Sequence, residues 1–114
     1  YAVLQRAQSA ACAAVAPGMT CEVIVSVSRP ILTQAGLGDL FIHRTGHGIG
    51  LETHEEPYIV SGNSRRLEPG MAFSIEPGFY RPGVVGSRNE DIVVCGADGP
   101  IMCNQRPHEL AVVD

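Results

Sequence analysis

Three histidines and two glutamates have the side chains and the spacing that a metal site needs. His43, His47 and His54 lie within twelve positions of one another, and His47 stands directly between two glycines. Glu76 and Glu90 fall in segments expected to be strands, where a carboxylate is an unusual choice. Imidazole nitrogen together with carboxylate oxygen suits a divalent ion such as zinc, manganese or cobalt. One interpretation of these five residues is therefore a metal site.

The same part of the sequence also has structural interpretations. A single histidine near a strand end is more often a surface or core residue than a ligand. His43 and His47 have the spacing of one helix face, but the neighbouring glycines disfavour a helix. Glu55–Glu56 is most simply a solvated turn. Glu90–Asp91 is equally interpreted as an exposed charge pair with Arg88 as its ionic partner. Composition and periodicity leave the metal site and these alternatives open.

Two helices are expected before the histidines. The segment Ala2–Ala16 is rich in alanine, has apolar residues at helical spacing and stops at Pro17-Gly18. Thr20 is a suitable N-cap for a second helix that ends near Gly36. Several β-branched residues and Pro30 disfavour that helix, so local propensity and the helix prediction disagree here.

Alternating segments after the histidines predict strands that place the acidic residues. An apolar row ending at Ile75 puts Glu76 on the opposite face of its strand. A continuous strand further on puts Arg88 and Glu90 on one face and Asp91 on the other. The predicted strands are Leu40–Ile42, Met71–Ile75, Arg88–Val94 and Leu110–Val113, with a turn at Gly96–Gly99. Two helices followed by antiparallel-type strands predict an α+β fold.

Length, composition and charge limit the class of protein. With 114 residues the chain is expected to form one domain, and 45% apolar with 18% charged residues excludes intrinsic disorder. No apolar run approaches the ~18 residues that span a bilayer. The net charge is −4, and the eight basic residues are all arginines, scattered except for Arg65-Arg66. We therefore expect a soluble globular domain without a nucleic-acid or membrane partner.

The cysteines and the first residues of the chain indicate the cellular compartment. The four cysteines form no Cys-x-x-Cys pair, which disfavours a zinc ribbon, and their low density disfavours a disulfide scaffold. The start of the chain does not have the pattern of a signal peptide. Both observations predict a cytoplasmic protein.

Three segments in order resemble the pita-bread metallopeptidases. They are His43–Tyr58, Leu67–Tyr80 and Gly86–Asp91. Within that superfamily, Ser74–Gly78 with a tyrosine soon after, and the Arg88-x-Glu90-Asp91 pattern, resemble the Xaa-Pro dipeptidase (prolidase) and aminopeptidase P branch. The resemblance implies that residues 1–114 are the C-terminal half of a pita-bread (creatinase/aminopeptidase-like) catalytic domain, with two helices followed by a mainly antiparallel curved sheet.

The resemblance also implies a metal-dependent hydrolysis. Family members cleave the bond before proline with two divalent ions that activate a water and polarise the carbonyl. By motif, His47 and Glu76 correspond to ligands of one ion, and Glu90 to a carboxylate that bridges both. The two other ligands of the family are aspartates upstream of Tyr1. We therefore expect that 1–114 alone binds at most one ion, weakly, and that manganese, cobalt or zinc fills the complete domain.

The remaining roles are implied in the same way. Glu76 corresponds to the residue that moves a proton from water to the leaving amine. His54 corresponds to the histidine that stabilises the oxyanion and contacts substrate, and His43 to one that lines the substrate pocket. Arg88 corresponds to a substrate-side residue that orients the carboxylates. The implied substrates are short proline-containing peptides, and the resemblance suggests a homodimer.

Three hypotheses for function follow. The first is a Xaa-Pro dipeptidase that needs the complete domain, with the 114-residue chain inactive alone. The second is a non-catalytic relative that binds peptides or proteins. The third is a truncated, inert copy, for which the unusual segment Val23–Pro30 is the best support.

Overall fold

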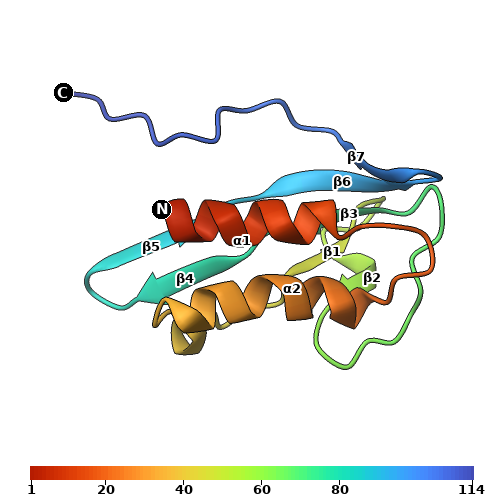
Figure 1. The fold of residues 1–114 in the computed structure, drawn as a ribbon, viewed down its shortest axis with the longest axis horizontal. Helices are drawn as coiled ribbons and strands as arrows, with labels where there is room; N and C mark the ends of the chain where they lie inside the picture. Colours follow the sequence, from red (N-terminus) through yellow and green to blue (C-terminus); the bar gives the residue numbers. More distant parts are fainter.

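A computed structural model describes all 114 residues and contains two α-helices, a 3-10 turn and seven strands (Figure 1). In chain order the elements are α1 (Ala2–Ala13), α2 (Cys21–Gln34), the 3-10 turn η1 (Gly38–Leu40), β1 (Gly46–Gly48), β2 (Glu55–Ile59), β3 (Ala72–Ile75), β4 (Gly78–Arg81), β5 (Val85–Arg88), β6 (Asp91–Gly96) and β7 (Gly99–Met102).

Five strands form one antiparallel sheet in the order β2-β1-β3-β6-β7, and β4 and β5 form a separate hairpin. Gly48 pairs with Phe73, and Ile75 pairs with Asp91. The strands β1, β3 and β6 are therefore neighbours in the middle of the sheet. Two helices followed by antiparallel strands confirm the α+β prediction.

Both helices pack on one face of the sheet, where they run in opposite directions (Figure 1). Strand residues alternate between faces, so Phe73 and Ile75 of β3 enter the core under the helices. Ser74 and Glu76 consequently lie on the other face, as the alternation predicted. The main core cluster consists of Ala11, Cys12, Val15, Cys21, Ile24, Val25, Ile59, Leu67, Phe73, Ile75, Val93 and Cys95.

The second helix forms despite its β-branched residues and Pro30. Ile24 and Val25 are buried in the core, and this burial outweighs their weak helix propensity. The hydroxyl of Thr20 makes no capping hydrogen bond. Instead, the backbone N–H groups of Cys21 and Glu22 donate to carbonyl oxygens of the loop that follows β2. Tertiary contacts therefore replace the local cap that the sequence suggested.

Several predicted boundaries are wrong. The first helix ends at Ala13, and Leu40–Ile42 is not a strand because Gly38–Leu40 forms a 3-10 turn. The strand expected over Arg88–Val94 is interrupted at Asn89 and Glu90. The last strand is β7 instead of Leu110–Val113, which has no regular structure.

The structure also tests the expectations about two turns, the cysteines and membrane-spanning helices. Glu55–Glu56 begins β2 and is not a turn. The predicted turn at Gly96–Gly99 joins β6 to β7. All four cysteines are free thiols, three of them buried. Neither helix is long and apolar enough to cross a membrane.

Candidate metal centre

His47 lies on β1, which is held tightly between β2 and β3. A Cβ atom on Gly46 would overlap the carbonyl oxygen of Ser74, and one on Gly48 would overlap that of Glu56. Glycine on both sides of His47 is therefore required by the close approach of the neighbouring backbones. The His47 N–H donates to the Ser74 hydroxyl oxygen at 3.1 Å, which ties the histidine to β3.

Glu76 follows β3 directly and is 5% exposed. Its backbone N–H donates to the Thr45 carbonyl at 2.7 Å. The Ser74 hydroxyl donates to one carboxylate oxygen, Oε1, at 2.8 Å. Arg88 donates to the other oxygen, Oε2, at 2.9 Å. These bonds fix the carboxylate, and the arginine compensates for the burial of its charge.

Glu90 lies in the break between β5 and β6 and is exposed. One potential ligand atom from each of His47, Glu76 and Glu90 lies within 4.8 Å of the others. The three residues come from β1, from the end of β3 and from the start of β6, which are adjacent in the sheet. The fold therefore brings together the three side chains that the motifs suggested as ligands.

The chemistry of this donor set fits a cation. His47 Nδ1 lies 2.9 Å from the Gly48 carbonyl oxygen, so Nδ1 carries the proton and donates. In the neutral ring, Nε2 then offers a lone pair toward Glu76 Oε1, 3.1 Å away. Two acceptors at that distance repel each other unless a second ring proton or a metal ion lies between them. One imidazole and two carboxylates suit zinc, manganese or cobalt.

His54 and His43 each pack against aromatic rings near this centre. The exposed His54 ring packs edge-on against His47, with ring centroids 4.6 Å apart. His43 packs between the rings of Phe41 and Tyr80, at 5.0 and 5.6 Å. The Nδ1 atom of His43 donates to the Arg44 carbonyl at 2.7 Å, while Nε2 is buried without a partner. Burial lowers the pKa of His43 below its ordinary value, which favours the neutral ring.

Arg88 joins Glu76 to Tyr80. Its Nε atom donates to the Tyr80 hydroxyl oxygen at 2.7 Å, and this bond is the largest contribution that raises the pKa of Arg88. The alternative in which Arg88 pairs with Glu90–Asp91 is wrong, because the arginine binds Glu76 and Asp91 binds Arg106. Arg88 therefore holds the same carboxylate that faces His47.

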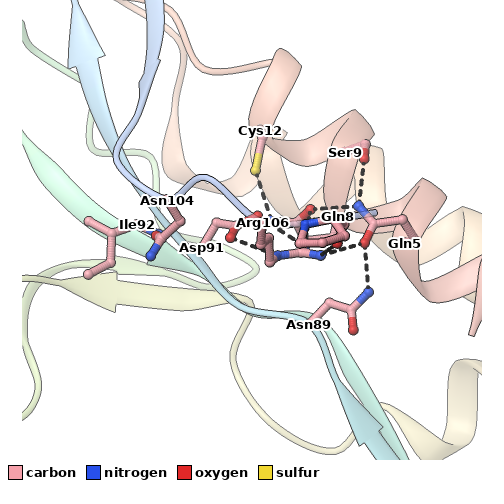
Figure 2. Close-up of polar contacts among 10 residues, drawn as sticks. Gln5, Gln8, Ser9, Cys12, Asn89, Asp91, Ile92, Asn104 and Arg106 are labelled. Carbon is pink, nitrogen blue, oxygen red and sulfur yellow. Dashed lines mark hydrogen bonds and ion pairs between the residues drawn. The ribbon is translucent and has the colours of Figure 1, made fainter. Parts of the chain in front are cut away.

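Sequence reasoning missed two groups of residues around this centre. Ser74 lies two residues before Glu76 on the same strand face, so alternation alone was a usable signal for it. Tyr80 belongs to the motif, but alternation gives no sign of its contact with Arg88, which comes from the next strand. A network of Gln5, Gln8, Asn89, Asp91 and Arg106 on the helix side of the sheet was also missed (Figure 2).

Comparison with known proteins identifies the family of this chain. Residues 1–97 match the model of metallopeptidase family M24. The protein named "Probable dipeptidase PepE" of Mycobacterium bovis is 58% identical over 113 residues, which is 99% of this chain and 30% of that protein. A Xaa-Pro dipeptidase of Lactobacillus helveticus is 56% identical over 99 residues, or 87% of this chain and 27% of the relative.

A solved structure shows the same fold. Dipeptidase PepE from Mycobacterium ulcerans superposes with a TM-score of 0.92 at 58% identity, covering 95% of this chain and 29% of that one. The chain thus spans about 30% of the length of the relatives it matches.

Proposed function

This chain belongs to metallopeptidase family M24, in its Xaa-Pro dipeptidase (prolidase) branch, and on that premise we propose that the protein carrying it hydrolyses Xaa-Pro bonds in short peptides. The observation that carries the proposal is the convergence of His47, Glu76 and Glu90 within 4.8 Å. Three acceptors from separate strands have no structural need to meet, because each is more cheaply solvated apart from the others.

The proposed roles follow from the contacts. His47 and Glu76 would hold one divalent ion, and Glu90 would be shared with a second. When bound, such ions supply Lewis acidity and make water a nucleophile at neutral pH. Manganese, cobalt and zinc all suit the donors. We propose that other parts of the complete domain supply the remaining ligands, so that residues 1–114 alone are inactive and bind at most one ion weakly.

The side chains of the chain itself would manage protons and charge. Glu76 would take a proton from the attacking water and pass it to the leaving amine, with Ser74 and Arg88 holding its carboxylate in place. The exposed His54, beside His47, would donate to the developing oxyanion. His43 would line the substrate pocket as a neutral ring.

Activity of the full-length protein with manganese or cobalt tests the proposal. We expect cleavage of a Xaa-Pro dipeptide that Glu76→Ala abolishes and Glu68→Ala leaves intact, since Glu68 is an exposed carboxylate in a turn. Absence of cleavage, or cleavage that survives Glu76→Ala, would contradict the proposal. If elemental analysis of the purified full-length protein finds no bound metal, the hypotheses of a non-catalytic binding module or an inert copy are favoured.

We also propose a cytoplasmic location and a homodimer. The four free thiols, three of them buried, support a reducing compartment. The homodimer rests on the family alone, and its test is the mass of the full-length protein by light scattering.

A further inference from the structure

A second polar cluster lies on the helix side of the sheet, between α1 and the residues at the start of β6 (Figure 2). It joins Gln5 and Gln8 of α1 to Asn89 and Asp91, the residues on either side of Glu90. Arg106, from the irregular segment after β7, joins both halves. Four of these five side chains belong to buried residues; only Arg106 is half-buried.

Arg106 binds both carboxylate oxygens of Asp91. Its Nε donates to Oδ1 of Asp91 at 2.9 Å and its Nη2 to Oδ2 at 3.0 Å, a two-pronged pair that fixes direction as well as distance. Gln8 adds a third bond to Oδ2 at 2.7 Å. Both oxygens of the Asp91 carboxylate therefore accept hydrogen bonds within the cluster, and none of these donors belongs to the metal centre.

The same arginine also reaches the other side of Glu90. Its Nη1 donates to Gln5 Oε1 at 2.9 Å, and the Asn89 side-chain amide donates to the same oxygen at 3.1 Å. Both neighbours of Glu90 are thus held to α1 by one connected set of bonds. Because successive side chains in an extended chain point to opposite sides, anchoring 89 and 91 to the helix side turns Glu90 toward the metal side.

The cluster also reaches Glu76 through the backbone. Asp91 pairs with Ile75 across β6 and β3, and Ile75 directly precedes Glu76. Within 103–114, Arg106 is the one residue that is not exposed. The terminal segment is therefore attached to the body at the point where two carboxylates are presented to the centre.

We propose that Arg106 is a positioning residue for the metal centre: by holding Asp91 and Asn89, it fixes the backbone that presents Glu90. This inference rests on the proposed function, because it takes Glu90 as a ligand. Arg106 touches neither the ion nor the substrate, and its effect passes through residues 89 and 91.

Affinity of the full-length protein for Co²⁺ alone tests the inference without any substrate. In Arg106→Met we expect the dissociation constant, from calorimetry, to rise about 10- to 100-fold, the usual effect of losing a group that orients a ligand. The visible absorption of bound Co²⁺ should change as well, because one carboxylate is displaced. Arg106→Lys, which keeps the charge but not the two-pronged contact, should fall between Arg106→Met and the parent.

Two control variants separate positioning from other effects. Arg65→Met breaks an exposed pair with Glu56 and removes the same charge away from the centre. Val15→Ala opens space in the core beneath the helices and lowers the melting temperature without touching the cluster. Both should keep the Co²⁺ affinity of the parent within about twofold, an expectation that follows from their lack of a link to Glu90.

The outcomes are distinct. Unchanged Co²⁺ affinity and absorption in Arg106→Met, or an equal loss of affinity in Val15→Ala, would overturn the inference. If Arg106→Met does not fold, Arg106→Lys decides, and parental affinity in that variant counts against positioning. A parent protein that does not cleave Xaa-Pro bonds would contradict the proposed function. If its Co²⁺ affinity still depends on Arg106, the positioning role of Arg106 stands. A parent that binds no Co²⁺ would overturn both.

Discussion

Two buried carboxylates on opposite faces of the sheet each have an arginine, and the two pairs differ in completeness. Asp91 has both oxygens occupied by Arg106, with Gln8 added. Glu76 gives one oxygen to Arg88 and turns the other toward His47, with only Ser74 as a donor. Arg106 is 25% exposed and Arg88 44%. Asp91 is thus held by donors alone, whereas the Glu76 oxygen that faces His47 Nε2, a second acceptor, is suited to bind a cation.

The substitution expected to have the largest effect on this difference between the Glu76 and Asp91 sites is Glu76→Gln. We expect activity of the full-length protein to fall about 1,000-fold or more, because an amide neither accepts the proton nor binds the ion as a carboxylate does. Stability of the metal-free protein should change by less than about 1 kcal/mol, since the amide N–H can donate to His47 and the lost ion pair is partly exposed. Steady-state kinetics and urea unfolding measure the two effects, and a large loss of stability would contradict the assignment.

The matching change on the other face is Asp91→Asn. It leaves Arg106 with one acceptor and turns an amide N–H toward donors, so we expect unfolding in urea to need about 3 kcal/mol less free energy than in the parent. The matched control is Glu56→Gln, whose partner Arg65 is exposed and whose change should be within about 0.5 kcal/mol. If Asp91→Asn lowers the free energy of unfolding no more than this control does, the Asp91 and Glu76 sites do not differ in the way described above.

The smallest expected effect is on the pH dependence of stability and comes from His43. Burial lowers its pKa in the folded state below the ordinary value of 6.5, so the unfolded chain binds the proton more readily. The stability due to neutral His43 is therefore present above pH 6.5 and is lost as the pH falls through the lower pKa of the folded state. In metal-free protein, His43→Gln should show a smaller fall in stability from pH 7.5 to 5.5 than the parent. An identical pH dependence in both proteins would show that His43 does not contribute.

The sequence allowed prediction of the features that depend on local pattern. Alternation placed Glu76 opposite the apolar row, the alanine-rich segment gave the first helix, and the glycine-flanked His47 drew attention to the centre. Apolar burial then settled the second helix, where propensity alone was divided. The motif resemblance grouped His47, Glu76 and Glu90, and their potential ligand atoms lie within 4.8 Å of one another in the structure.

The predictions that were wrong or missing concern features that depend on contacts between segments distant in the sequence. The strand predicted over Arg88–Val94 is interrupted because the chain leaves its partner β4 after Arg88 and joins β3 at Asp91, a change of partner that periodicity does not record. Arg106 and Gln5 lie far apart along the chain, and neither differs by type or spacing from a solvated surface residue. Leu110–Val113 has the composition of a strand, but β7 already occupies the edge of the sheet beside β6.

The order of the strands has a consequence for how the centre forms. One candidate ligand lies on β1, one directly after β3 and one directly before β6; these are the three inner strands, while β2 and β7 form the borders of the sheet. No isolated hairpin contains all three groups. Ion uptake by a refolding chain should consequently appear only after the long-range pairings on both sides of β3 are complete, late in the reaction and in a single phase, which makes it a reporter of finished tertiary structure.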